Sequence, residues 1–320
     1  MFHYESKDLS IPEVHKLLLG GVAPRPIALV STISKDGINN LSPFSFFNAF
    51  GANPPIVAFS ASRRGKDATL KDTYNNLIET KECVIQAVTH SMVEQVSLAS
   101  VEFSSEIDEF IKSGLTPIDS DLVRSKRVKE SPFQMECKLL EMRSFGEGGA
   151  SANLSICEVL KFHVAEDLFT NGIIDPLKID LVARMSGNFY SRAGSGVFVV
   201  EKPIGKKCIG YDQVTKHIRE SEIYSANDLG KFGNSESIPS EDDVKVFIQN
   251  INDEKIQDFE DGFEAFLRYQ YINDYKKMLK AALHIQDNKI RNIELAVKSA
   301  LQSNDMDFAW KAALFVKNIK

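Results

Sequence analysis

Short apolar runs separated by polar turns dominate residues 22–200 of the chain. Runs of four to eight mostly apolar residues bounded by turn residues are typical of strands, and the run at Phe133 also alternates as a half-buried strand does. The pattern predicts strands over Ile27–Ile33, Ile56–Ser60, Cys83–Val88, Phe133–Leu140, Leu154–Val164 and Gly196–Val200. Many short strands favour a closed or split barrel over a doubly wound sheet.

Helices are predicted between these strands and, above all, after them. The interspersed segments are Pro12–Leu19, Thr69–Thr80, Ser91–Ser100 and Glu106–Ser113. After about Lys202 a glycine-containing connector runs to Pro239, and Ser240 followed by Asp243 indicates a helix start. Apolar residues then recur at helical spacing over 258–285, and two more helices are predicted over Ile290–Leu301 and Phe308–Ile319.

The fold class that follows is mainly β with added helices, ending in an α-helical C-terminal extension. We place the domain boundary between residues 203 and 204, and we detect no internal repeat. The apolar stripe of the extension is interpreted as core. We expect residues 240–320 to form a small helical bundle that packs on the barrel or serves a partner, because its apolar positions need burial.

Composition and charge exclude several classes of function. A hydrophobic content of 43% and a charged content of 26% are typical of a soluble globular protein. The formal net charge of −6 argues against a nucleic-acid partner, which calls for a basic face. No apolar run reaches the roughly 20 residues that span a bilayer, and the N-terminus lacks the apolar core of a signal peptide. We therefore expect no membrane association and a cytoplasmic location.

The cysteines, histidines and common catalytic motifs point to no metal and no side-chain catalyst. The four cysteines and six histidines are scattered without metal-ligand spacing, and Cys83, Cys137 and Cys157 lie in apolar runs where thiols behave as small hydrophobes. The chain has no GxGxxG, GxxxxGK[ST] or GxSxG motif. A hydrolytic Ser-His-Asp set stays open on this evidence alone.

Hydroxyl, amide and basic groups gather where three apolar strands end. These groups donate hydrogen bonds to a phosphate monoester, and amides and hydroxyls beside aromatic rings suit a flat, polar-edged ring. For Ser42–Asn48 the alternative is an edge strand that packs its phenylalanines, and for Ser60–Thr73 it is a solvated basic loop. The candidate binding residues are Ser31, Thr32, Ser42, Pro43, Phe44, Ser45, Phe46, Asn48, Ser60, Ser62, Arg63, Arg64, Lys71, Asp72, Thr73 and Asn76.

The order of these segments resembles the flavin reductase-like family, in the branch of flavoredoxins and nitrilotriacetate monooxygenase reductase components. The resemblance covers roughly residues 20–200. It is carried by Arg25-Pro26, Asn40 to Pro43 with Ser45, Lys71-Asp72-Thr73 with Asn76, Asp108-Glu109-Phe110, Gly114-Leu115-Thr116, Ser131-Pro132, Glu136-Cys137 and Arg184 to Tyr190.

The resemblance implies a homodimeric, FMN-binding split β-barrel with FMN near the subunit interface. It implies that Ser42 to Phe46 contact the flavin ring and that Ser60, Ser62, Arg63, Lys71 and Thr73 contact the phosphate. Tyr190 belongs to the family's closing pattern, although Ser186-Gly187 stands here where the family has a glycine pair. Arg64 is a second candidate cation for the phosphate, and Asp72 is expected to orient Lys71 or Arg64.

Two functions remain in competition at this point, with a third behind them. The first is an NAD(P)H-dependent flavin reductase that uses FMN, with NADH or NADPH as electron donor. The second is a flavoredoxin-like FMN electron carrier that a partner protein reduces, and a monooxygenase or another electron acceptor is the expected protein partner. The third is a binding module on the same barrel. Hydride transfer to a flavin needs no side-chain acid or nucleophile, so no catalytic residue is expected.

Overall fold

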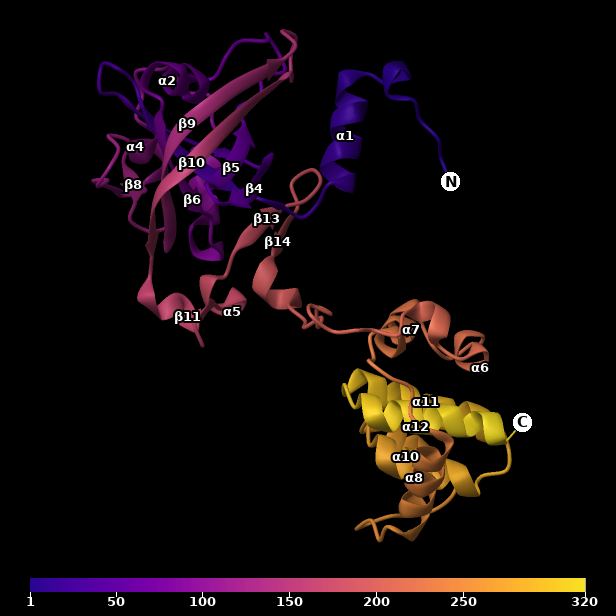
Figure 1. Cartoon of the computed structure of the whole chain (residues 1–320). Coiled ribbons are helices and arrows are strands. Elements are labelled where there is room, and N and C mark those ends of the chain that lie inside the picture. The colour runs from indigo at the N-terminus through magenta and orange to yellow at the C-terminus, as the bar shows by residue number, and fades with distance from the viewer. Residues whose placement is uncertain (320) are drawn as a thin grey trace. The chain divides into compact units, whose positions relative to one another are not determined.

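The structure is a computed structural model that describes residues 1–319 (Figure 1). The chain divides into two compact units, Met1–Val199 and Val200–Lys320, and each is described by itself. The first unit is mainly β and the second is helical, as the residue patterns predict. No helix of the described chain combines the length and the apolar character that a bilayer span requires.

Strands of the first unit form one large sheet and three small ones. The large sheet is antiparallel and has the order β3-β2-β6-β9-β10-β5-β4, so β3 and β4 are its two edges. The strands are β1 (Arg25–Pro26), β2 (Ala28–Ile33), β3 (Asn39–Phe44), β4 (Phe47–Ala52), β5 (Pro55–Ser60), β6 (Glu82–Ala87), β7 (Pro117–Ile118), β8 (Arg127–Val128), β9 (Phe133–Phe145), β10 (Ala152–Val164), β11 (Phe169–Thr170), β12 (Ile173–Ile174), β13 (Val182–Arg184) and β14 (Tyr190–Arg192).

The large sheet is a split barrel with apolar side chains on both of its faces. Successive residues of a strand point to opposite faces. Ala28 and Val30 accordingly pack in one core with Phe44, Phe59 and Leu77, and Leu29 packs in a second core with residues that include Leu41 and Phe110. Cys83, Cys137 and Cys157 are free thiols buried in the first core, which confirms their interpretation as small hydrophobes.

Among the described residues, five α-helices accompany the strands of the first unit. They are α1 (Ile11–Gly21), α2 (Asp72–Thr80), α3 (Val93–Leu98), α4 (Glu109–Ser113) and α5 (Pro176–Ile179). Leu77 of α2 and Phe110 of α4 each enter one of the two cores. By contrast, α1 buries none of its residues, although Ser10 and Glu13 close its start as a capping box.

The predicted strand Gly196–Val200 is wrong. Ala193–Gly196 forms a 3-10 turn, and Val197–Val200 has no strand partner within the described residues. Val199 is 90% exposed, so the apolar run has neither a neighbouring strand nor a core to stabilise it. The other predicted strands are present with shifted ends, and the helix predicted from Thr69 begins only at Asp72.

The second unit is built from helices around a single apolar core. They are α6 (Lys216–Arg219), α7 (Ala226–Gly233), α8 (Glu241–Asp253), α9 (Phe263–Tyr271), α10 (Tyr275–His284), α11 (Lys289–Gln302) and α12 (Met306–Phe315). Ser240 and Asp243 form the predicted capping box of α8. The connector is part of this core, because Val214, Ile218 and Phe232 pack in it.

Two helical hairpins in this unit have the same design, which corrects our reading that no repeat is present. The turn of the hairpin α9-α10 contains Asn273 with φ 57°, and the turn of α11-α12 contains Asn304 with φ 58°. Asp274 and Asp305 then cap the next helix, accepting hydrogen bonds at 3.1 Å from the N–H groups of Lys277 and Phe308. Asn-Asp at each turn and Lys-Ala-Ala-Leu in each following helix are identical, with a spacing of 31 residues.

Candidate functional site

Five of the candidate residues line one small hollow in the first unit. They are Ser42, Arg64, Lys71, Asp72 and Thr73, joined by residues that include Asn40, Glu102 and Glu109. The hollow encloses about 30 Å³, which is room for about one water molecule. The structure therefore brings the end of β3 and the end of the loop after β5 next to the start of α2. Side chains limit the space between them.

Lys71 is the available cation of this hollow. It precedes α2 as the N-cap residue, and its side chain forms no ion pair or hydrogen bond with any of residues 1–319. Its Nζ lies 5.4 Å from the centroid of the Phe44 ring. Burial lowers the pKa of Lys71, the nearby Arg64 charge lowers it further, and the Glu102 carboxylate partly opposes this fall. A partly buried cation that forms no ion pair gains by meeting an anion.

Arg64 is held by its own chain. Its Nη1 donates to the carbonyl of Leu70 and to the hydroxyl of Thr69. Carboxylates lie on both sides of it, with Asp72 at 3.6 Å and Glu102 at 3.4 Å. Asp72 therefore meets Arg64 in this structure. These contacts explain why α2 starts at Asp72, because they keep residues 69 and 70 in the preceding loop.

A buried polar network lies beside the hollow and joins Thr73 to two further candidates, Thr32 and Asn76. The Thr32 and Thr73 hydroxyls donate to Asn40 Oδ1 at 3.2 and 2.8 Å, and Asn76 Nδ2 donates to the Thr32 hydroxyl at 3.0 Å. Thr32 is fully buried, and Thr73 and Asn76 are also buried. In this arrangement the three side chains connect β2, β3 and α2 to one another.

Glu109 completes that network from α4. Its carboxylate accepts hydrogen bonds from Asn40 Nδ2 at 3.2 Å and from the Leu41 N–H at 3.0 Å. Burial raises the pKa of Glu109, although these two donors oppose the rise. The Leu41 N–H points away from β2, towards the outer edge of β3. Residues 41 and 43 direct their main-chain N–H groups to the same edge, so the missing N–H of Pro43 costs no hydrogen bond of the sheet.

Ser60 ends β5, and Ser62 and Arg63 follow it, against the turn between β9 and β10. The Ser60 and Ser62 hydroxyls are 3.0 Å apart, and Ser60 Oγ accepts from the Asn153 N–H at 3.2 Å. Arg63 Nη1 donates to the Ala68 carbonyl at 2.9 Å. Arg63 Nε is buried without a hydrogen-bond partner among the described residues. Such an orphaned donor is rare in native structures, and a water molecule or a ligand would satisfy it.

The segment expected to contact a ring lies at the end of β3 and the start of β4. Phe44 is buried and tilts against Phe59 with a centroid separation of 5.3 Å, whereas Phe46 is partly exposed and meets the His15 ring edge at 6.4 Å. Ser45 Oγ accepts from Arg25 Nε at 3.4 Å, and exposed Asn48 accepts from the Ala49 N–H at 2.9 Å. Phe44 therefore packs in the core, as the alternative of an edge strand that packs its phenylalanines predicts.

Ser31 and Tyr190 lie away from the hollow. Ser31 is fully buried in β2, and its hydroxyl donates to the carbonyl of Lys126. Tyr190 lies in β14, where the Arg184 guanidinium is 4.6 Å from the centre of its ring. Arg25 of β1 belongs to the same small sheet, and its Nη2 donates to the Met185 carbonyl at 2.9 Å.

Asp121, Glu136 and His163 form a cluster with metal-ligand chemistry, but it is already satisfied. The two Glu136 oxygens accept from the N–H groups of residues 121–123 and contact His163 Nε2 at 2.6 Å. Burial alone would raise the pKa of Glu136, yet these contacts outweigh it and the pKa lies below its ordinary value. Lys161 Nζ lies 2.5 Å from Asp121, so the cluster is a structural network.

Sequence reasoning missed Glu102 and gave Asn40 and Glu109 no role as lining residues. Asn40 and Glu109 lie in segments that we matched to the family, and their side chains meet only in the fold. Glu102 gives no local signal, because it lies in a loop and its significance comes from its 3.4 Å distance to Arg64. Only tertiary structure reveals these contacts.

The donor set around the hollow fits a phosphate monoester. Lys71 forms no ion pair within residues 1–319, and the first turn of α2 lines the same hollow. Arg63 Nε, which lacks an acceptor among the described residues, is not part of the hollow's lining but follows β5 in the same loop as Arg64. Entry of a phosphate requires side chains at the mouth, exposed Glu102 above all, to move aside. The residues present therefore suit the terminal group of FMN.

Comparisons with known proteins concern this first unit. A family model for the flavin reductase like domain matches residues 20–178. A protein of Aquifex aeolicus (strain VF5) is 39% identical over 181 residues, which are 56% of this chain and 90% of that relative.

Two solved structures are similar to the first unit. Nitrilotriacetate monooxygenase component B from Bacillus cereus is 31% identical, with a TM-score of 0.59 over 62% of this chain and 98% of its own. A protein with a split barrel domain from Shewanella frigidimarina NCIMB 400 is 24% identical, with a TM-score of 0.55 over 64% of this chain and 100% of its own, and shows the fold alone.

Proposed function

The chain belongs to the flavin reductase-like domain family, and from this premise we propose that its first unit is an FMN-dependent reductase that takes electrons from NADH or NADPH. Family membership supports a flavin-related oxidoreductase or electron-carrier function. The finer assignment rests on one observation above the others, the unpaired Lys71 ammonium over Phe44 at the start of α2.

We assign the phosphate to Lys71, Arg63 and the hydroxyls of Ser60 and Ser62, while Thr73 and Asn76 keep the start of α2 in place. The end of β3 offers an apolar wall at Phe44 and Phe46 and polar groups at Ser42 and Ser45 for the ring. Bound FMN would supply the ring that accepts and releases electrons. The chain binds this ring, orients it and surrounds it with donors.

FMN binding is the first test of this proposal. Full-length protein should quench the fluorescence of added FMN, and riboflavin, which lacks the phosphate, should bind at least about tenfold more weakly because one charge-assisted contact contributes about 1.4 kcal/mol. The same titration with Lys71→Met should abolish most of this preference. If FMN and riboflavin bind equally well to the unaltered protein, the assigned phosphate site is wrong.

The second test separates a reductase from an electron carrier. Under anaerobic conditions, FMN-loaded protein mixed with NADH or NADPH should lose its visible flavin absorbance and oxidise the nicotinamide. If neither nicotinamide reacts and a separate reductase protein reduces the flavin, the carrier function replaces the enzyme. The carrier alternative is kept because the sequence has no recognisable nicotinamide motif.

We further propose that the first unit forms a homodimer with a second copy of this chain. The apolar face of α1 is uncovered, with Leu17 and Leu18 each about half exposed, and Phe50 on the edge strand β4 is 67% exposed. Unpaired edge strands and uncovered apolar helices are stabilised by association. Sedimentation equilibrium should give a dimer, and Leu17→Asp with Phe50→Asp should give monomers. A monomeric unaltered protein contradicts the proposal.

A protein acceptor is the remaining part of the proposal. The Bacillus cereus neighbour is a component of a monooxygenase, so we expect this chain to deliver reduced flavin or electrons to a monooxygenase or another acceptor protein. Affinity purification from the native cell with and without added FMN should recover a flavin-dependent oxidase or oxygenase. Recovery of no such enzyme under either condition would argue for free flavin as the product. The cytoplasmic location and the domain boundary after residue 203 stay predictions.

A further inference from the structure

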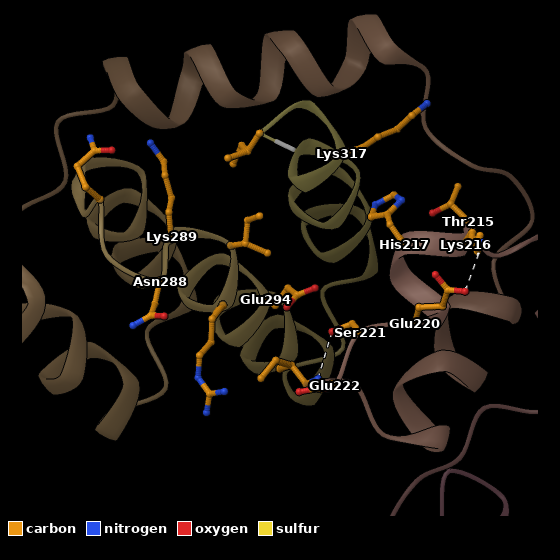
Figure 2. Close-up of a pocket in the computed structure, with 15 residues that line it drawn as sticks. Thr215, Lys216, His217, Glu220, Ser221, Glu222, Asn288, Lys289, Glu294 and Lys317 are labelled. Carbon is orange, nitrogen blue, oxygen red and sulfur yellow. Dashed lines mark hydrogen bonds and ion pairs between the residues drawn. The ribbon is translucent and has the colours of Figure 1, made fainter.

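The second unit contains a wide polar cleft of about 1160 Å³ (Figure 2). Its walls are the segment Thr215–Ile223, the start of α11 and the last turn of the chain at Lys317 and Ile319. Figure 2 shows Asn288 and Lys289 on one side, His217 and Lys317 on the other, and Glu294 between them. This volume exceeds the range of about 300–1,000 Å³ typical of small-molecule sites.

Three cations in this cleft have no partner of their own. Lys289, Arg291 and Lys317 line it from two different elements, and none of them forms an ion pair or hydrogen bond within residues 1–319. The other cation, Lys216, is 3.6 Å from Glu220, the C-cap residue of its own helix α6. Glu222 and Glu294 add negative charge along the middle of the cleft. The cleft therefore offers positive charge at two places separated by a carboxylate.

The start of α11 makes the first of these places more positive. Its first turn has no acidic residue, whereas α7, α8 and α9 each have at least one, and Asn288 provides no side-chain cap. The unsatisfied N–H groups of a helix start carry about half a positive charge. Lys289 and Arg291 add to this charge instead of neutralising it, an arrangement that costs stability until an anion is present.

Neutral groups in the cleft suit main-chain amides better than a nucleotide. Thr215 Oγ1 is shielded from solvent and has no hydrogen-bond partner among the described residues, and Asn288 and Gln286 offer both donors and acceptors. Apart from the His217 imidazole, no aromatic ring in the described lining is available to stack on a base. Ile223, Ile290 and Ile319 provide apolar contacts for aliphatic side chains.

The scaffold around the cleft supports the same kind of ligand. Repeated helical hairpins stack into units whose extended surfaces bind other chains. Here the second hairpin supplies one wall of the cleft through the start of α11, and α6 supplies another. We propose that this cleft binds an extended peptide segment of another protein, with acidic side chains against Lys289, Arg291 and Lys317.

Peptide selection on the full-length protein tests this proposal directly. The probe is a phage-displayed library of random dodecapeptides, and the strongest binder is then synthesised with a fluorescent label. We expect enrichment of Asp and Glu over the starting library. The labelled peptide should bind K289E/R291E/K317E at least about tenfold more weakly, because three attractive contacts become repulsive.

A matched triple variant controls for overall charge. K207E/K255E/K276E changes the net charge by the same amount at exposed lysines outside the cleft and should keep its affinity within about twofold. Equal losses in both variants would reduce the binding to non-specific electrostatics and overturn the proposal. Absence of enrichment, or enrichment of neutral or basic peptides, would overturn it as well.

Hydrogen exchange distinguishes the cleft from other surfaces and does not depend on the variants. The selected peptide should slow amide exchange in residues 215–223 and 286–294 of the unaltered protein. Protection elsewhere would contradict the assigned site. Displacement of the peptide by ATP or by single-stranded DNA, with the same sensitivity to K289E/R291E/K317E, would assign the cleft to phosphate ligands instead.

Discussion

The hollow of the barrel unit and the cleft of the helical unit differ in how many of their positively charged side chains form ion pairs. In the hollow, Arg64 is enclosed by Asp72 and Glu102 and only Lys71 remains unpaired, in a space of about 30 Å³. In the cleft, three unpaired cations line about 1160 Å³. The hollow suits one small anion of defined shape, and the cleft suits an extended one.

The two regions also differ in whether their hydrogen bonds join residues that are distant or close in the sequence. Around the hollow, buried hydrogen bonds join residues that are far apart in the sequence, such as Thr73 and Asn40. In the helical unit, the turns at Asn273 and Asn304 repeat the same local hydrogen bonds. We therefore expect substitutions near the hollow to have larger and less local effects than substitutions at the helical turns.

The largest expected effect concerns two neighbouring asparagines of α2. Asn76 is buried and donates to Thr32 Oγ1, whereas Asn75 is exposed. Asn76→Ala should lower the free energy of unfolding by about 2 kcal/mol, because it leaves a buried hydroxyl without its donor. Asn75→Ala should change it by less than about 0.7 kcal/mol. Urea unfolding without flavin measures both, and equal effects would show that the network contributes nothing to stability.

The next effect is the pH dependence of FMN affinity. Phosphate binding requires protonated Lys71, whose pKa burial lowers from its ordinary value, so affinity should fall by about tenfold as pH rises through that lowered pKa. The fall should begin below the ordinary lysine range near about 10.4. Fluorescence titrations at increasing pH measure it. Riboflavin affinity, and the FMN affinity of the Lys71→Met variant, should not show this part of the fall. An identical pH profile for riboflavin would show that the fall does not depend on the phosphate.

The two helix caps of the repeated hairpins provide a smaller effect. Asp274→Ala and Asp305→Ala should each lower the free energy of unfolding by about 1 kcal/mol, since each removes an N-cap hydrogen bond. Asp305→Ala should cost somewhat more, because Asp305 also accepts from the Tyr275 hydroxyl at 3.0 Å. Denaturation of Tyr275→Phe in both backgrounds isolates that difference. A cap effect at one turn only would contradict the equivalence of the hairpins.

The smallest effect tests the closure of the hollow. Glu102 lies 3.4 Å from Arg64 and is exposed. Glu102→Gln should raise FMN affinity by about threefold, since it removes a competing carboxylate at a largely solvent-exposed ion pair. Glu106→Gln, at an exposed position in the following segment, is the matched control and should leave the affinity unchanged. A weaker affinity of Glu102→Gln would show that Glu102 supports the site.

Much of the fold could be predicted from local pattern, and parts of the site could not. The central strands follow from apolar runs because burial on both faces leaves few alternatives. Val197–Val200 has the same composition without a strand neighbour, and so it fails. The repeat was overlooked because the matching residues lie in the turns and second helices, while the first helices differ in length and composition.

Within the candidate site, the sequence assigns Ser42 to the ring segment and Lys71 and Thr73 to the phosphate segment, and the fold brings these residues to one hollow. The sequence could not choose between Arg64 and the other cations as the partner of the phosphate. That choice depends on Glu102, about thirty residues away along the chain, and on the burial of Lys71 over Phe44. Nor could it separate Asn76 from Asn75, because the side of α2 that meets β2 is decided by packing.

The sequence by itself determined which segments form strands and helices, which family the first unit resembles, and which residue types could hold a phosphate, since these follow from local pattern and chemistry. Tertiary structure decided which of those polar groups satisfy one another and which stay free. Hydrogen bonds and ion pairs act over a few ångströms, so the choice rests on contacts between residues that only the fold brings together.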